Sequence, residues 1–470
     1  MPLILGTNSI KDTGFDVANS LRFNDGSSDH LTRSLGASET STQKGTFSFW
    51  VKRGQLGTAQ IIYSNEVADD NNRAFIQFED DDTFRIKDTV SGSNTTHYAT
   101  TQKFRDVGAW YHMVVALDST EAGGNRIRVY KNGTRIPDAN FGTSTEPNQN
   151  SDFKLLTGGQ TNKNHIGKIH GGANHFDGYL AEFVYCDGQV LDASSFGEFD
   201  GDSPVWKPKS VSGLTMGDQG FYLDFEDSSA LGNDKAGSNN FGTVTNLAAT
   251  DQTTDTCTNN FATMNSLDNY YASTTFSEGN LKMVTNGSAI VYNTSTIGFS
   301  SGKWYMEVKL GSSSGEVLGV ITGPATANDN DNKIGNRADG WGYDYRGLVE
   351  NAGSDEGGSF AAFDSGDVIG VYADLDNDKI YFSKNGTLQN SGTGLNLDVA
   401  GSPTYFFAVG DNHGSNAATF EVNFGNPVSA LSSAVSDGTY GSFEYSTTIT
   451  GDSASKTFKA LNTKNLAEFG

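Results

Sequence analysis

The chain contains the same turn-forming phrase twice, about 250 residues apart. Residues 126–136 read RIRVYKNGTRI and residues 379–387 read KIYFSKNGT, so each copy leads from an alternating strand into Lys-Asn-Gly-Thr. Asn-Gly supplies two residues that tolerate positive φ, which a tight hairpin turn requires. Each copy also follows an apolar run that ends in Asp, at Asp118 and at Asp374. Two similar β-meander pieces at this separation predict two β-sandwich domains in tandem, and they favour binding over catalysis.

Strand periodicity divides the chain into five segments. We expect an N-terminal arm over residues 1–17, a first sandwich over 18–200, an irregular connector over 201–270, a second sandwich over 271–426 and a C-terminal β-rich tail over 427–470. The short strands alternate apolar and polar residues and are separated by turn residues at a spacing typical of a sandwich. The predicted fold class is therefore all-β, with two tandem antiparallel β-sandwiches.

The charge and the hydropathy of the chain exclude several classes of partner. The formal net charge is −24, and such an acidic surface repels phosphate backbones, so nucleic acid is not expected as a partner. No stretch approaches the roughly 20 apolar residues of a membrane span. The opening MPLILGTNSIKDTG has one short apolar run and no basic region before it, so we do not expect a signal peptide. Exposure outside the cell would then follow another route, such as cell lysis.

The two cysteines are too few for a disulfide framework and lack the spacing of metal ligands. Cys186 lies in an expected core strand, where a buried thiol behaves as a small apolar residue. The sequence leaves open whether Cys186 and Cys257 form a bridge.

Motifs of the first sandwich resemble those of a lectin superfamily. Trp110-Tyr111-His112-Met113-Val114, the following IRVYKNG and the closing FDGYLAEFVY are similar to the laminin-G-like branch of the concanavalin A-like lectin/glucanase superfamily. The similarity covers about residues 18–200 and implies a jelly roll.

The second sandwich resembles a SPRY domain over roughly residues 273–426. The strand GKWYMEVKL, the hairpin DVIGVYADLDNDKIYFSKNG and the closing strands YFFAVG and FEVNFG carry this resemblance. In SPRY domains ligands usually meet the loops at one end of the sandwich. The resemblance therefore implies recognition by loops around Asn328–Arg337 and Asn412–Asn416. The candidate ligand-binding residues are Asn328, Asp329, Asn330, Asp331, Arg337, Tyr345, Asn412, His413 and Asn416.

Aromatic residues of the second sandwich give a separate binding signal. Trp341, Tyr343 and Tyr345 alternate along GWGYDYRG, so their side chains share one face of a strand. The favoured interpretation is that this face, at least at Trp341, belongs to the core. The alternative is a sugar-binding face, because aromatic rings stack on the C–H faces of sugars.

The arrangement as a whole resembles structural proteins of marine tailed bacteriophages. The resemblance rests on ILGTNSIKDTGFDVANSLRF, YCDGQVLDASSFGEFD with the following VWKPK, DQTTDTCTNNFATMN and FKALNTKNL. It implies a virion protein that is made in the host cytoplasm and exposed on the particle. Its implied partners are other virion proteins and a glycan or protein of the host surface. A fibre would be a homotrimer by analogy.

Three functional hypotheses follow. We favour a non-enzymatic fibre or appendage adhesin, and the alternative is a capsid decoration or other structural virion component without receptor binding. The third is a polysaccharide depolymerase, for which Glu79 and Asp81 are the nearest approach to the alternating acidic residues of glucanases. The second glutamate of that motif is missing, and the stretch falls where a hairpin turn is expected.

No cofactor is expected, and calcium is the ion that the sequence raises as a candidate. Asp69, Asp70 and Asn72 fall in a loop where laminin-G-like domains sometimes hold calcium. The acidic run from Asp374 begins like a calcium loop, but Lys379 stands where that loop needs glycine, and a hairpin turn is favoured. The seven histidines show no metal-binding spacing.

Overall fold

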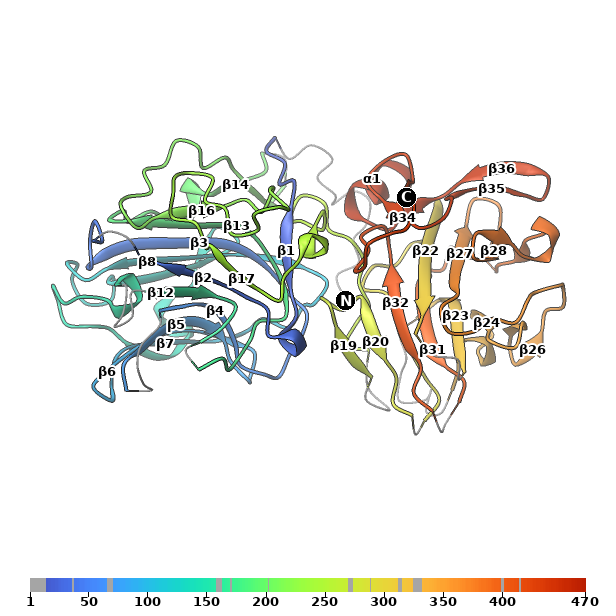
Figure 1. Cartoon of the computed structure of the whole chain (residues 1–470), viewed down its shortest axis with the longest axis horizontal. Coiled ribbons are helices and arrows are strands. Elements are labelled where there is room, and N and C mark those ends of the chain that lie inside the picture. The colour runs from blue at the N-terminus through green and yellow to red at the C-terminus, as the bar shows by residue number, and fades with distance from the viewer. Residues whose placement is uncertain are drawn as a thin grey trace. The chain divides into compact units, whose positions relative to one another are not determined.

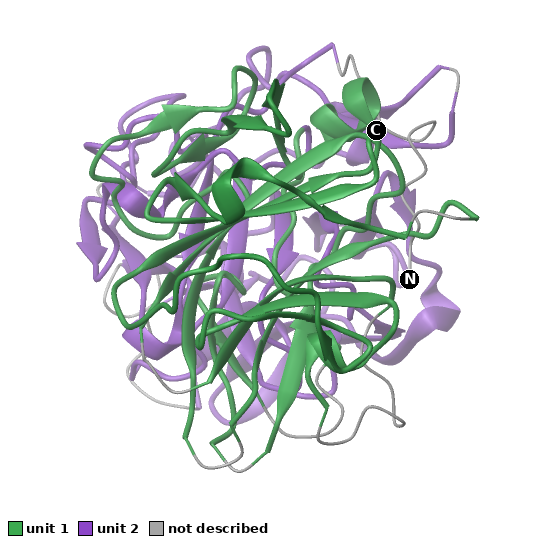
Figure 2. Ribbon diagram, turned by 90° about the vertical axis from the view of Figure 1, so that its right-hand side faces the viewer, with its two compact units in different colours: residues 1–11, 259–470 green, residues 12–258 purple. Residues whose placement is uncertain are grey.

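The protein divides into two compact units (Figures 1 and 2), here called the N-terminal unit, which ends at Thr258, and the C-terminal unit, which begins at Asn259. The computed structural model describes residues 14–35, 38–65, 71–157, 163–169, 171–201, 203–268, 274–287, 289–311, 315–323, 332–398, 401–413 and 416–470. Within these ranges no helix is long and apolar enough to cross a membrane.

The described part of the N-terminal unit contains two eight-stranded antiparallel sheets (Figure 1). The first sheet consists of β1 (Ser20–Phe23), β3 (Lys44–Arg53), β8 (Trp110–Asp118), β9 (Ile127–Lys131), β10 (Thr134–Arg135), β13 (Gly178–Asp187), β16 (Phe221–Leu223) and β18 (Gln252–Thr253). The second consists of β2 (His30–Ser34), β4 (Gln60–Asn65), β5 (Arg73–Phe78), β6 (Thr83–Val90), β7 (Ser93–Lys103), β11 (Phe141–Thr145), β12 (Lys163–Ile166) and β17 (Thr243–Thr245). A separate hairpin is formed by β14 (Gly197–Phe199) and β15 (Trp206–Pro208).

Strand β3 shows how alternation builds the core of this unit. Phe47, Phe49 and Val51 lie in the main hydrophobic cluster, which takes side chains from both sheets. The intervening Trp50 and Lys52 point to the opposite face of the first sheet, as the period of two in a strand requires. Both are nevertheless buried, so this outer face is covered as well.

The cover comes from the chain that follows the sandwich. Of the irregular connector predicted over 201–270, the described residues up to Thr258 belong to the N-terminal unit. The Asp255 carboxylate accepts hydrogen bonds from Lys52 Nζ at 2.8 Å and from Trp110 Nε1 at 3.1 Å. Lys52 and Asp255 are both 0% exposed, so the segment is fastened through a fully buried ion pair.

The two cysteines and the N-terminal arm also meet this outer face. Both thiols are free, which settles the question that the sequence left open. Cys186 is buried, and its Sγ lies 3.8 Å from Met216 Sδ. Of the predicted arm, residues 1–13 lie outside the described residues, whereas Val17 is buried in a cluster that includes Trp50.

In the described part of the C-terminal unit, a nine-stranded and a six-stranded sheet form the second sandwich. The larger sheet consists of β19 (Thr275–Ser277), β20 (Lys282–Val284), β22 (Lys303–Leu310), β27 (Val368–Asp374), β28 (Lys379–Lys384), β29 (Thr387–Leu388), β30 (Leu395–Asn396), β32 (Thr419–Asn423) and β37 (Lys459–Ala460). The smaller consists of β21 (Val291–Thr294), β23 (Glu316–Ile321), β24 (Gly340–Asp344), β25 (Val349–Asn351), β26 (Ser354–Asp355) and β31 (Phe406–Asp411). The all-β prediction of tandem sandwiches is therefore confirmed.

The C-terminal tail covers the outer face of the larger sheet. It consists of the hairpins β33 (Val435–Ser436) with β34 (Ser442–Phe443) and β35 (Thr448–Gly451) with β36 (Ala454–Thr457), then β37 and helix α1 (Thr463–Phe469) (Figure 1). Phe443 and Phe458 pack in one cluster with Tyr305 and Tyr372 of the sheet. The sequence did not predict α1, whose first turn is capped by the Asn462 side chain.

Short 3-10 helices complete the described connections between strands. They span Asp25–Ser27, Asp138–Asn140, Lys154–Leu156, Ala193–Ser195, Ala249–Asp251, Ile334–Asn336 and Asn390–Gly392.

Both copies of the repeated phrase form the hairpin turn that they predict. Asn132 and Gly133 have φ of 46° and 79°, and Asn385 and Gly386 have φ of 49° and 75°. Each asparagine also binds back to the neighbouring strand. The Asn132 side chain accepts the amide of His112 at 2.8 Å, and the Asn385 side chain accepts the amide of Val368 at 2.8 Å.

Each turn glycine lies against an aromatic ring from the segment that follows its own sandwich. A Cβ at Gly133 would fall 2.2 Å from Cε3 of Trp206, and a Cβ at Gly386 would fall 2.6 Å from Cδ1 of Tyr445. These positions therefore require glycine for two reasons, the positive φ and the space that the ring occupies.

We expect Gly133→Ala and Gly386→Ala to destabilise their own units more than a positive φ alone would. Gly57→Ala and Gly366→Ala are matched controls, because φ is +74° and +89° there and no described atom lies within 4 Å of the added carbon. The controls should cost about 1 kcal/mol. The turn variants should cost about 1–3 kcal/mol more, because the ring must move. Calorimetric unfolding would measure this, and equal losses at all four positions would contradict it.

Candidate functional site

The described residues next to β23 and β31 in the two loops predicted to form one recognition surface lie at opposite ends of the six-stranded sheet. Glu316, the first residue of β23, pairs with Asp411, the last residue of β31. The loop containing Arg337 follows the far end of β23, whereas Asn412 and His413 directly follow Asp411. Because β23 and β31 are antiparallel neighbours, the register separates the two loops by the length of the strand. Among the described residues, Arg337 and His413 therefore lie at different ends of the sheet.

Arg337 is held by Asp339 of its own loop and by Tyr292 of strand β21. Its Nε donates to Asp339 Oδ1 at 2.8 Å, its Nη2 donates to Asp339 Oδ2 at 2.6 Å and its Nη1 donates to the Tyr292 hydroxyl at 3.1 Å. These bonds from Arg337 lower the pKa of Asp339. The remaining candidates of this loop that lie outside the described residues are Asn328, Asp329, Asn330 and Asp331.

Tyr345 lies at the same end of the sheet as His413. The Tyr345 amide donates to the carbonyl of Glu316 at 3.0 Å, and the His413 amide donates to the Asp411 carboxylate at 2.7 Å. Burial raises the pKa of Asp411 to about 6. Asn412 is half-buried and its amide donates to Gly315, while Asn416 is exposed.

The aromatic alternation along β24 belongs mainly to the core. Trp341 is 4% exposed and Tyr343 is 0% exposed, and both pack in the main cluster of the C-terminal unit. Tyr345 is half-buried against that cluster. The core interpretation of Trp341 is thus confirmed.

The predicted calcium loop is only partly described. Asp69 and Asp70 lie outside the described residues, and the Asn72 side chain accepts the amide of Ser91 at 3.0 Å. Across the part of the chain that the structure describes, no group of three or more His, Cys, Asp or Glu residues could hold a metal ion. Calcium binding remains a prediction.

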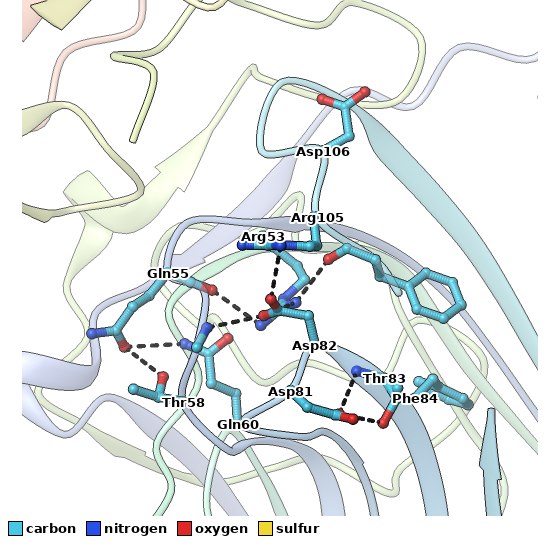
Figure 3. Close-up of polar contacts among 12 residues, drawn as sticks. Arg53, Gln55, Thr58, Gln60, Asp81, Asp82, Thr83, Phe84, Arg105 and Asp106 are labelled. Atoms are coloured by element: carbon cyan, nitrogen blue, oxygen red, sulfur yellow. Dashed lines mark hydrogen bonds and ion pairs between the residues drawn. The ribbon is translucent and has the colours of Figure 1, made fainter. Parts of the chain in front are cut away.

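The structure gives polar partners to Glu79 and Asp81, the residues nearest to a glucanase motif. Glu79 is 7% exposed and its carboxylate lies 2.7 Å from Arg85 Nε. Asp81 accepts hydrogen bonds from the amide and the hydroxyl of Thr83 at 3.1 and 2.7 Å, as Figure 3 shows. The Asp81 carboxylate therefore closes the β5–β6 turn, as the hairpin interpretation expects.

Asp82, which the sequence did not single out, is the centre of the polar network in Figure 3. Its carboxylate lies 3.0 Å from Arg53 Nη1 and 3.1 Å from Arg105 Nε, and it accepts the amide of Gly57 at 2.9 Å. The Arg53 side chain is 0% exposed and also donates to the carbonyl of Phe104. This network joins strands and turns of the N-terminal unit, and its buried charges are paired.

Among the described residues, a cavity suited to a ligand lies on the outer face of the larger sheet of the C-terminal unit. It is a groove of about 280 Å³ between strands β22, β27 and β32 and the tail segment 427–445, and we call it the extension groove. Its apolar lining includes Val368, Pro427, Val428 and Leu431. Its polar lining includes Glu307, Lys309, Glu421, Asn423, Ser429, Ser432 and Glu444.

Glu307 fastens the tail that forms one wall of this groove. Its carboxylate accepts the amides of Glu444 and Tyr445, each at 2.7 Å, and the Tyr305 hydroxyl at 2.9 Å. The residue is 2% exposed. Burial raises the pKa of the Glu307 carboxyl to about 7, although the hydrogen bonds oppose this shift.

The other charged groups of the groove are nearer the solvent. Glu421 accepts the Ser429 hydroxyl at 3.1 Å, and Glu444 accepts the amide and the hydroxyl of Ser432. Lys309 is exposed. An aliphatic lining beside hydrogen-bonding groups suits a small amphiphilic ligand, and the volume is near the lower end of the range of about 300–1,000 Å³ that is usual for such sites. The arrangement can bind a group about the size of one sugar ring.

The N-terminal unit has an open hollow at Gly123–Asn125, Arg135 and Asp138. Arg135 Nη2 donates to the carbonyl of Gly124 at 3.1 Å and to Asp138 at 3.3 Å. These polar groups bind one another, so the hollow offers a ligand less than the extension groove does.

Comparison with known families identifies both domains. The model of the concanavalin A-like lectin/glucanases superfamily matches residues 25–193, and the model of the SPRY domain matches residues 303–426. The chain therefore contains a concanavalin A-like domain followed by a SPRY domain, as the motifs predict. Both are domain types that suggest a role in binding or adhesion.

Solved structures similar to the chain include SPRY domains. The SPRY domain of human HERC1 is 19% identical, covering 30% of this chain and 87% of its own, with a TM-score of 0.26. A human SPRY domain is 18% identical, covering 30% of this chain and 91% of its own, with a TM-score of 0.23. Stonustoxin is 18% identical, covering 34% of this chain and 27% of its own, with a TM-score of 0.27. No curated protein sequence matches the chain significantly.

We expect the Glu307 carboxyl to make the C-terminal unit less stable as pH rises. Its pKa is about 7 in the folded protein against an ordinary value of 4.5, so the folded state binds more protons between these values. Its contribution to the free energy of unfolding is then present below pH 4.5 and lost as pH rises to about 7, by up to about 3 kcal/mol. Glu307→Gln should remove this part of the slope in calorimetric unfolding between pH 4.5 and 7.5.

The control for this measurement is Glu356→Gln, which changes an exposed glutamate of the same unit. It should keep the wild-type slope. An identical slope in the wild type and in Glu307→Gln would contradict the role of the Glu307 carboxyl.

Proposed function

We propose that the chain is a non-enzymatic adhesin of a tailed-bacteriophage particle, whose SPRY unit binds a glycan or a protein on the host surface. The types of the two domains support a binding role, because one is lectin-like and the other is a SPRY domain. The extension groove is the observation that carries the proposal, since it combines an aliphatic lining with hydrogen-bonding groups at the surface.

The virion assignment rests on the sequence phrases that resemble marine phage structural proteins. The net charge of −24 is compatible with a soluble exposed component that avoids nucleic acid. Other virion proteins would then be its permanent partners, and the host surface its transient one. Recognition in the groove requires no cofactor in this proposal.

The experiment should block the groove without changing charge or the fold. Ala430 lines the groove and is exposed, so Ala430→Trp should fill the groove and leave the core intact. Ala434→Trp is the matched control, because Ala434 is exposed on the same tail segment and is not among the lining residues. We expect the wild type and Ala434→Trp to bind host envelopes or array glycans, and Ala430→Trp to lose at least about tenfold in affinity, or about 1.4 kcal/mol.

Two results would overturn this function. Equal binding by Ala430→Trp and the wild type would place recognition elsewhere. No binding of the wild type to host envelopes, together with infectivity that survives deletion of the protein, would favour the capsid-decoration alternative. Immuno-electron microscopy of the particle would locate the protein in either case.

A further inference from the structure

Two histidines that are about 145 residues apart in the sequence meet in the N-terminal unit. His30 is the first residue of β2, and His175 lies in the turn that leads into β13. Their ring centroids are 5.8 Å apart and the ring planes are inclined by 40°. Both side chains are half-buried, so solvent reaches this pair.

Hydrogen bonds to the backbone fix the tautomer of each ring. His30 Nδ1 lies 2.8 Å from the carbonyl oxygen of Ser28, and His175 Nε2 lies 2.8 Å from the carbonyl oxygen of Gly172. A carbonyl oxygen only accepts, so in the neutral rings these two nitrogens carry the hydrogens. The lone pairs are left on Nε2 of His30 and Nδ1 of His175. The latter atom is buried and has no hydrogen-bond partner among the described residues.

The spacing of the rings fits a shared metal ion. With a metal–nitrogen distance of about 2.0–2.1 Å, two imidazoles on one ion have centroids from about 5 Å apart at a tetrahedral angle to about 6.4 Å apart when they are opposite each other. The observed 5.8 Å falls within this range. Histidines that bind metals usually donate their second nitrogen to a carbonyl or a carboxylate, and both rings here do so.

We propose that His30 and His175 form a two-histidine site for a divalent transition-metal ion such as Cu²⁺, Ni²⁺ or Zn²⁺. The remaining coordination positions are open to water or to donor atoms of a ligand or of another protein. Imidazole nitrogen suits these ions, whereas Ca²⁺ and Mg²⁺ prefer oxygen. The site is independent of the extension groove and of the proposed adhesin function.

The positive charge of Lys168 near the two rings allows a test that distinguishes a metal site from simple packing of the rings. Burial lowers the pKa of both imidazoles, and the nearby Lys168 lowers it further, so the charge of this ammonium acts on both rings. The same ammonium repels a bound cation. Lys168→Gln should therefore tighten metal binding, although it leaves both histidines in place.

The experiment uses the full chain and calorimetric titration with ZnCl₂, with CaCl₂ as the hard-ion comparison. We expect one zinc site in the wild type and a loss of at least about tenfold in affinity in His30→Gln and in His175→Gln. His97→Gln is the matched control, because His97 is another half-buried histidine of the same unit, on strand β7, and it should bind as the wild type does. Lys168→Gln should bind more tightly.

Electron paramagnetic resonance of the Cu²⁺-loaded wild type gives a reading that needs no variant. Couplings from two imidazole nitrogens would support the site even where a histidine variant fails to fold. A wild type that binds no zinc, or a His175→Gln variant that folds and binds as tightly as the wild type, would overturn the proposal. Binding that His97→Gln abolishes would overturn it as well.

Discussion

A buried carboxylate fastens the following chain segment to the outer face of a sheet in each unit. Asp255 pairs with Lys52 in the N-terminal unit, and Glu307 accepts the amides of Glu444 and Tyr445 in the C-terminal unit. Removing one partner of a buried ion pair leaves an uncompensated charge and costs about 3–5 kcal/mol. The first sheet of the N-terminal unit and the larger sheet of the C-terminal unit are therefore each covered on both faces. The extension groove exists only because this cover leaves a gap over β22, β27 and β32.

The same cover explains why the Lys-Asn-Gly-Thr turn occurs in two different sandwiches. Its glycine exposes a flat backbone surface, on which Trp206 packs in one unit and Tyr445 in the other. In the N-terminal unit Trp206 Nε1 also donates to His112 Nδ1 at 2.9 Å. Burial lowers the pKa of His112 to about 3, so that ring stays neutral and can accept this bond. The two sandwiches belong to different domain types, yet in each of them the turn glycine leaves room for an aromatic ring of the covering segment.

Alternation and turn chemistry made most of the strands predictable. The alternate positions of Phe47, Phe49 and Val51 indicate a buried face of a strand. The core position of Trp341 follows from the same period of two. The segment after the first sandwich has no such period, so it was expected to be an irregular connector. Its attachment to the first sheet depends on single long-range contacts, such as that of Asp255 with Lys52, which local composition does not reveal.

For the candidate sites, the residue types could be proposed from the sequence but their grouping could not. The sequence by itself determined the all-β class and the two Asn-Gly hairpins, because these depend on periods and turns of a few residues. Its longer motifs carried the resemblance to both domain types, which the family models match. Only the tertiary structure placed Arg337 and His413 at opposite ends of a sheet, formed the extension groove and brought His30 to His175. Strand register and long-range pairing decide such neighbours, and both are set by the packing of the whole unit rather than by any local pattern.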